Sequence, residues 1–153
     1  VKKNPMEIIL QKATELGVSK IIPIVSERTE VKELNHDRAK KISIEATEQS
    51  SQMLPPEILE VTKLKDFLEN FNKNTKLLFA DVNSKNNLRS DDLKDFESLC
   101  ILIGPEGDFT PSERQSILSV SKVAPFTMSN NILRTDTAVI SAISLVNFIN
   151  NLP

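Results

Sequence analysis

The chain has 153 residues, of which 39% are hydrophobic and 26% are charged, and its formal net charge is −2. This composition is typical of one globular domain with a core of its own, and no apolar run reaches the roughly 20 residues that a membrane-spanning helix needs. The acidic balance argues against a protein that holds nucleic acid by bulk electrostatic attraction. We therefore expect a soluble domain located in the cytoplasm.

The first third of the chain predicts two helices around a short strand. Residues 4–16 predict a helix with signals at both ends, because Asn4 can cap the first turn and Gly17 follows the last one. The apolar run 21–25 predicts a strand that lies at a sheet edge or ends early, since Pro23 interrupts it. A second helix is predicted over 35–53. The expected core-facing residues of the two helices are Met6, Ile9, Leu10, Ala13 and Leu16, then Ala39, Ile42, Ala46, Gln49 and Met53.

Strands and helices alternate in the remainder of the chain. The predicted order is strand 58–61, short helix 64–71, strand 76–82, a polar loop 83–95 with a partial helical turn, strand 99–103, a helix after Thr110, strand 126–128, and a last helix that Thr135 caps. In that last helix we expect Ala138, Ala142, Ile143, Val146 and Ile149 to face the core. This alternation predicts an α/β fold with a mainly parallel sheet and helices on both faces. Ligands of such sheets bind beyond the carboxyl ends of the strands.

The single cysteine and the single histidine do not predict a catalytic or metal-binding site. Cys100 is the only cysteine and lies in the apolar run 99–103, so we expect it in the core without a disulfide partner. His36 is the only histidine and lies in a polar stretch, which indicates a surface position. Neither a metal site nor a nucleophile–base pair can be assembled from these two residues.

Two of the three glycines fall in the link between strand 99–103 and the helix after Thr110. Gly104 and Gly107 allow a positive φ or the close approach of a ligand, although a tight turn explains them equally well. The loop contains Glu106 and Asp108 but no lysine and matches no phosphate-binding motif, which disfavours a nucleoside triphosphate. Acidic groups suit a ligand with a positive centre, such as the sulfonium of S-adenosylmethionine, or they favour the nearby helix N-terminus.

A second polar segment, residues 130–137, lies between the last strand and the last helix. Its Arg134 can present a planar fork to a phosphate or a base oxygen, or it can form a surface ion pair. Charge is also uneven along the chain: residues 1–41 carry nine Lys or Arg against six acids, and residues 42–153 carry ten against fifteen. A surface that faces RNA would thus favour the N-terminal end, although a solvated helix face explains each lysine as well.

Gly-Pro-Glu-Gly at 104–107 and Leu-Arg-Thr-Asp-Thr-Ala at 133–138 resemble motifs of the 16S ribosomal RNA uracil-3-methyltransferases of the SPOUT superfamily. Shorter matches lie at 11–17, 26–28, 48–49 and 56–57, so the resemblance covers most of the chain. It implies one SPOUT-type domain over 1–153 with a C-terminal trefoil knot, a rare exception to unknotted folds. It also implies S-adenosyl-L-methionine as cofactor, a homodimer, and 3-methyluridine in small-subunit ribosomal RNA as product.

The resemblance has three departures. Family members normally begin with a PUA-like barrel domain that no residue before Val1 supplies, which implies a fragment or reduced RNA affinity. Asp108 replaces a second glycine and tolerates a left-handed backbone better than most residues. Gln52 and Asn131 stand where basic residues are expected, which affects expected RNA contacts more than cofactor binding.

The resemblance assigns site residues as follows. Arg134 would stabilise negative charge on the uracil oxygens, and Asp136, Glu106 or water would remove the proton. Lys12, Arg28 and Gln49 would contact RNA, and no metal is expected. The expected cofactor contacts are Leu78, Phe79, Ala80, Ile103, Gly104, Pro105, Glu106, Gly107, Met128, Ser129, Asn130, Ile132, Leu133, Arg134, Thr135 and Thr137. The alternatives are a non-catalytic knotted module for cofactor binding and dimerisation that has lost its RNA-binding arm, or an unrelated nucleotide-binding α/β domain.

Overall fold

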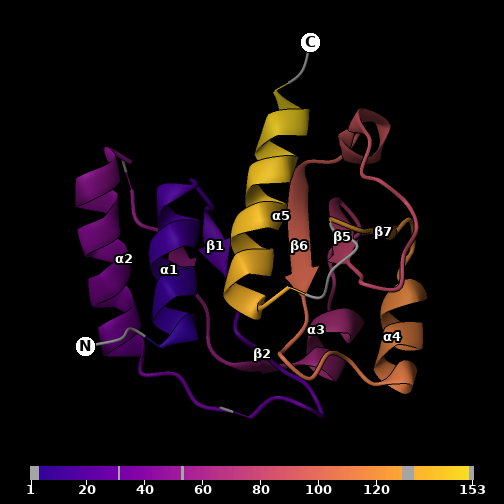
Figure 1. Cartoon of the computed structure of the whole chain (residues 1–153), viewed down its shortest axis with the longest axis horizontal. Helices are drawn as coiled ribbons and strands as arrows, with labels where there is room; N and C mark the ends of the chain where they lie inside the picture. Colours follow the sequence, from indigo (N-terminus) through magenta and orange to yellow (C-terminus); the bar gives the residue numbers. More distant parts are fainter. Residues whose placement is uncertain (1–3, 31, 53, 129–132, 152–153) are drawn as a thin grey trace.

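The computed structural model describes residues 4–30, 32–52, 54–128 and 133–151 (Figure 1). Its main sheet has three parallel strands in the order β6 (Ser98–Ile103), β5 (Thr75–Ala80) and β7 (Ala124–Phe126). Ala80 pairs with Ile103 on one side and with Phe126 on the other, so the three strands end together. All three carboxyl ends therefore lie at one edge of the sheet, as the predicted α/β class requires.

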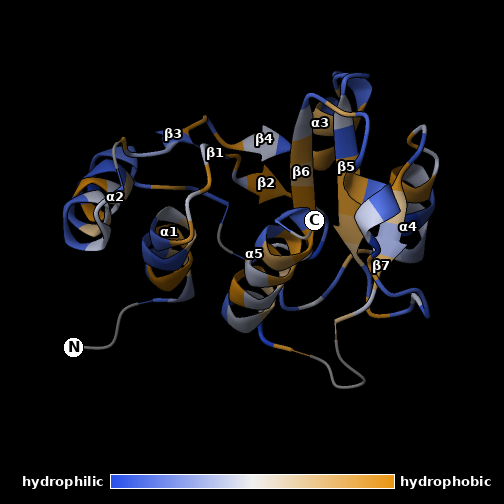
Figure 2. Cartoon of the chain, turned by 90° about the horizontal axis from the view of Figure 1, so that it is seen from above, coloured by the Kyte–Doolittle hydropathy of each residue, from blue (hydrophilic) through white to orange (hydrophobic). Residues whose placement is uncertain are grey.

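Helices cover both faces of this sheet because its strands alternate apolar side chains between the faces. Leu78 packs with residues of α5 (Thr135–Asn150) and of the short 3₁₀ helix η1 (Ser90–Leu93). Leu77 and Phe79 pack on the other side with α3 (Leu64–Glu69) and α4 (Pro111–Leu118). Figure 2 shows the hydrophobic strands of the sheet between these helices. The predicted mainly parallel sheet with helices on both faces is confirmed.

The N-terminal part forms a second layer of helices beside α5. Helix α1 (Pro5–Glu15) packs between α5 and α2 (His36–Ser50). Two short parallel pairs connect this part to the sheet: β1 (Lys20–Ile21) with β3 (Glu57–Ile58), and β2 (Ile24–Val25) with β4 (Thr62–Lys63). The break between β1 and β2 falls at Pro23, as predicted, and its carbonyl accepts a hydrogen bond from the Thr62 N–H at 2.9 Å.

Three expectations about the element ends are wrong. Thr135 is the first residue of α5, and Arg134 holds the cap position without a side-chain hydrogen bond. The last strand begins at Ala124 and contains Pro125, which is tolerated because β7 is an edge strand. Of the strand expected at 58–61, only Ile58 lies in a strand, β3, and β4 begins after that range at Thr62.

Two expected core positions are also corrected. The side chains of Met6 and Gln49 are exposed, because α1 and α2 bury narrower stripes than the apolar spacing suggested. Of the helix stripes expected, Leu10 and Ala13, then Ala39, Ile42 and Ala46, are buried. Met53 lies outside the described residues.

The predicted knot involves the segments 78–80, 103–107 and 128–137. Residues 129–132 of the last segment lie outside the described residues, so the knot stays a prediction. Within the described part of the chain, no helix is long and apolar enough to cross a membrane.

Candidate functional site at the carboxyl edge of the sheet

The loop 104–110 connects β6 to α4 at the carboxyl edge of the sheet. In Figure 1 the arrow of β6 points downward, and its tip lies beside the first turn of α5. A capping box fixes the start of α4: Glu113 N donates to Thr110 Oγ1 at 3.2 Å, and Thr110 N donates to Glu113 Oε1 at 2.9 Å. The end of β6 and this cap hold the two ends of the glycine loop in place.

Neither glycine of this loop has a positive φ, and both instead allow other atoms to lie close to the backbone. The left-handed residue is Asp108, with φ 61°, as the family departure suggested. A Cβ atom at Gly104 would lie 3.2 Å from the ring of Phe109 and from Asp108 Oδ1. A Cβ atom at Gly107 would lie 3.3 Å from the Cβ of Arg28. Of the two reasons that the sequence offered for glycine here, a positive φ does not apply, and the close approach of neighbouring side chains does.

Hydrogen bonds join the glycine loop to the start of α5. Thr135 N donates to Glu106 Oε1 at 3.2 Å, and Thr135 Oγ1 donates to Gly104 O at 3.4 Å. The Thr135 hydroxyl is thus used across the edge and not for capping its own helix, which explains the corrected cap. The two sequence motifs, about 30 residues apart, lie in contact.

Asp136 carries an oxygen atom without a hydrogen bond. Its Oδ1 is buried and lacks a hydrogen-bond partner among the described residues, although it lies 3.4 Å from Arg134 Nε. The distance makes the two groups an ion pair, but the geometry is too poor for a hydrogen bond. The Asp136 side chain is 14% exposed and that of Arg134 is 68% exposed. A buried acceptor of this kind calls for a donor that the described chain does not supply.

Of the three residues expected to contact RNA, Arg28 lies at the glycine loop. Its Nη1 donates to Gly107 O at 3.0 Å. Next to it, Glu27 N donates to Glu113 Oε2 at 3.0 Å, so the turn after β2 braces both the loop and the start of α4. Lys12 pairs with Glu15 within α1 at 3.1 Å, and Gln49 lies exposed on α2. Within the described ranges, no contact connects either of them to the loop.

The expected cofactor contacts occupy different environments. Leu78 and Phe79 are buried in the two halves of the core, so their side chains are not open to a ligand. Thr137 is exposed, and Ser129, Asn130 and Ile132 lie outside the described residues. The half-buried members of the set are Ala80, Ile103, Gly104, Pro105, Met128, Leu133 and Thr135.

A buried ion pair at the same edge was not predicted. Asp81 follows β5, its side chain is 2% exposed, and Arg114 of α4 binds it with Nη2–Oδ2 at 2.8 Å and Nε–Oδ2 at 3.2 Å. The hydrogen bond with Asp81 raises the pKa of Arg114. One feature of the sequence pointed to such a pair: a carboxylate directly after an apolar strand has to reach a partner or water.

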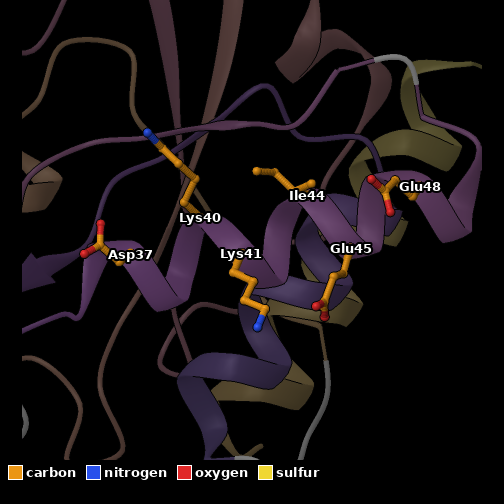
Figure 3. A pocket seen from close by; sticks show the side chains of 6 residues that line it. All are labelled: Asp37, Lys40, Lys41, Ile44, Glu45 and Glu48. Atoms are coloured by element: carbon orange, nitrogen blue, oxygen red, sulfur yellow. The ribbon is translucent and has the colours of Figure 1, made fainter.

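Among the surface hollows of the described residues, two are of similar size. One, the α2 hollow, measures about 370 Å³, and Figure 3 shows that its side chains all project from α2. The other, the sheet-edge hollow, measures about 350 Å³ and lies beside the glycine loop. Residues lining the sheet-edge hollow are Arg28, Asn83, Asp108, Phe109, Pro111, Arg114 and Gln115. In the part of the chain that is described, no cluster of His, Cys, Asp or Glu could hold a metal ion.

Comparisons with known proteins agree on one family. The family described as RNA methyltransferase domain matches residues 1–147. The chain is 33% identical over 149 residues to the ribosomal RNA small subunit methyltransferase E of Rickettsia conorii, covering 95% of this chain and 60% of that protein. It is 35% identical over 156 residues to the protein of the same name from Aquifex aeolicus, covering 97% and 65%.

The fold also matches solved structures. The ribosomal RNA small subunit methyltransferase E of Neisseria gonorrhoeae, bound to S-adenosyl methionine, superposes with a TM-score of 0.86 at 30% identity, covering 96% of this chain and 62% of that one. A probable rRNA-methyltransferase from Porphyromonas gingivalis gives 0.83 at 31% identity, covering 97% and 63%. The chain thus spans less than two thirds of the length of each of these relatives.

Proposed function

This chain belongs to the family of RNA methyltransferase domains, and from that membership we propose that it acts in the methylation of ring nitrogen 3 of a uridine in 16S ribosomal RNA, with S-adenosyl-L-methionine as methyl donor. The named relatives are ribosomal RNA small subunit methyltransferases, and one is bound to S-adenosyl methionine. The observation that carries the proposal is the pair of hydrogen bonds from Thr135 to Glu106 and Gly104. They support a single ligand cradle built from both family motifs.

The residues at this edge fit such a donor. Asp136 Oδ1 is a buried acceptor without a hydrogen bond, and a ligand with hydroxyl and ammonium groups would supply donors for it. Glu106 and Asp108 place negative charge near a ligand with a positive centre. The half-buried Ile103, Pro105 and Leu133 offer apolar surface for an aromatic ring.

The chemistry divides between the donor and the chain. When bound, S-adenosyl-L-methionine supplies a methyl group on a positively charged sulfur. Glu106 and Gly104, held by Thr135, would position that ligand. Arg134, mostly exposed beside the site, would stabilise negative charge on the uracil oxygens as the ring nitrogen loses its proton. Asp136, Glu106 and water remain the candidates that accept that proton.

We also propose the partners and the setting that this function implies. The substrate would be the RNA of the small ribosomal subunit, and the protein would act in the cytoplasm. A homodimer is supported by the exposed aromatic side chain of Phe148 on α5, which is 67% exposed. Analytical ultracentrifugation of the chain would show a single species of twice the monomer mass; a monomer at all concentrations contradicts this part of the proposal.

The function is tested in two steps. Calorimetric titration with S-adenosylhomocysteine should show one site per chain, and transfer of a labelled methyl group to small ribosomal subunits that lack the modification should yield 3-methyluridine. Binding without transfer, even when the chain is joined to the N-terminal part of a relative, would favour the non-catalytic module. Absence of binding would favour an unrelated nucleotide-binding domain and contradict the proposal.

A further inference from the structure

The sheet-edge hollow is built from segments far apart in the sequence. Arg28 comes from the turn after β2, Asn83 from the loop after β5, Asp108 from the glycine loop, and Arg114 and Gln115 from α4. Its volume of about 350 Å³ falls within the range of roughly 300–1,000 Å³ that is common for small-molecule sites. None of the site residues expected from the family motifs lines it except Arg28.

The lining is rich in hydrogen-bond donors but close to neutral in charge. The two guanidinium groups donate only, whereas the amides of Asn83 and Gln115 can donate and accept. Asp108 contributes a carboxylate at the rim, and the buried Asp81 neutralises Arg114 from behind. A phosphate group binds best where the net charge is positive, so this nearly neutral lining does not favour a phosphate. It favours a neutral planar group with several carbonyl oxygens.

The guanidinium of Arg28 has no acidic partner within the described part of the chain. Arg38, Arg114 and Arg134 each lie within 4.0 Å of a carboxylate, at 2.9, 2.8 and 3.4 Å. The contact of Arg28 is with the backbone oxygen of Gly107 at 3.0 Å, which engages one of its donors. The arginine is thus held in position by a neutral acceptor while the rest of its fork stays available for a ligand.

We propose that the sheet-edge hollow binds a uracil base of the RNA substrate other than the one that is methylated, an inference that rests on the proposed function. Uracil presents two carbonyl oxygens and one ring N–H on its edges. The guanidinium groups and amides would donate to the oxygens, and Asp108 or an amide oxygen would accept from the N–H. Hydrogen bonding to the edges of an unstacked base beside arginine and aromatic side chains is a usual way for proteins to recognise single-stranded RNA.

The test is a titration of the isotopically labelled chain with uridine 5′-monophosphate, followed by NMR. The side-chain amide signals of Asn83 and Gln115 should shift and saturate. Ribose 5-phosphate has the same phosphate but no base, and it should leave these signals unchanged. Equal shifts with both compounds would indicate that the hollow binds the phosphate. No shift with either compound would indicate that it binds no uracil base. Both results overturn the inference.

A pair of variants on one helix completes the test. Gln115→Trp places an indole into the hollow and should weaken uridine monophosphate binding at least tenfold. Ser116→Trp adds the same indole at an exposed position of α4 that does not line the hollow, and binding should stay within twofold of the original chain. Equal affinities for the two variants would contradict the inference.

A parallel titration with S-adenosylhomocysteine separates this inference from the proposed function. Shifts at Gly104 and Thr135 with that ligand, but none at Asn83 and Gln115 with uridine monophosphate, would overturn the base site and leave the methyltransferase proposal intact. Saturable shifts at Asn83 and Gln115 without any effect of S-adenosylhomocysteine would support a base site and contradict the methyl donor.

Discussion

The sheet edge and the outer face of α2 both carry a hollow of about 350–370 Å³, yet they are built differently. All six residues of the α2 hollow, from Asp37 to Glu48, come from one helix (Figure 3). The sheet-edge hollow draws on four segments, and the glycine loop beside it is bonded to the start of α5. Size alone therefore does not distinguish a functional site. Convergence of distant segments does, because each side chain is then fixed by contacts outside its own element.

The two regions also differ in the burial and the partners of their charged side chains. At the sheet edge, Asp81 is buried and held by Arg114, and Asp136 Oδ1 is buried without a hydrogen bond. On α2, the charged side chains are solvated and Ile44 is 41% exposed among them. We expect substitutions at the edge to change stability or activity and matched substitutions on α2 to change neither.

The largest effect is expected for Arg134→Ala. If Arg134 stabilises charge on the uracil, its loss should lower the rate of methyl transfer by roughly 10²–10³-fold. Affinity for S-adenosylhomocysteine should stay within about threefold, since the side chain is 68% exposed. Single-turnover methylation and calorimetry measure the two quantities. Lys41→Ala in the α2 hollow is the control and should leave both unchanged; an unaltered rate in Arg134→Ala would remove the role assigned to it.

Asp81→Asn should reduce the free energy of unfolding by roughly 2 kcal/mol. Removing one partner of a buried ion pair costs roughly 3–5 kcal/mol, and less here because the Arg114 side chain is 29% exposed. Denaturant unfolding followed by circular dichroism gives the value. Glu45→Gln makes the same chemical change in the α2 hollow and should cost less than about 0.5 kcal/mol. Equal losses for both variants would erase the contrast between the regions.

Gly104→Ala should destabilise the chain by about 1–2 kcal/mol, because the added methyl group meets the buried ring of Phe109 at 3.2 Å. Gly107→Ala should cost less, since its methyl group meets the Cβ of Arg28 at 3.3 Å, and Arg28 is an exposed residue of a turn and not part of the core. Thermal unfolding of the two variants provides the measurement. The reverse order would show that the glycine loop is not packed as described.

A smaller effect concerns β6 behind the glycine loop. Burial raises the pKa of Cys100 from 9.0 to about 11. The folded chain therefore holds the thiol proton more tightly than the unfolded chain, so this contribution to stability is complete below pH 9 and is lost as the pH rises toward 11. Between pH 9 and 10 the unfolding free energy should fall by about 1 kcal/mol more than in Cys100→Ala. Parallel curves for the two proteins would show an accessible thiol.

Local signals in the sequence predicted most of the fold. Asn4, which accepts a hydrogen bond from Glu7 N, and the capping box of Thr110 and Glu113 marked helix starts correctly. The alternation of strands and helices gave the α/β class, and the order of motifs gave the family. These features depend on residues within one turn or one strand of each other, which a single sequence displays directly.

The remaining features depend on long-range contacts that no local pattern encodes. Thr135 was predicted to cap the last helix, but its N–H donates a hydrogen bond to the carboxylate of Glu106, 29 residues away. The need for glycine at 107 comes from Arg28, 79 residues away, and Arg114 finds Asp81 across 33 residues. Only the parallel sheet, which brings the carboxyl ends together, makes these contacts possible.

The cradle formed by the glycine loop and the start of α5 is tested most directly by a crystal structure of the chain with S-adenosylhomocysteine. The ligand should contact the backbone of residues 104–107 and 133–135 and offer a donor to Asp136 Oδ1. A ligand found in the α2 hollow, or an empty sheet edge at saturating concentration, would contradict the account.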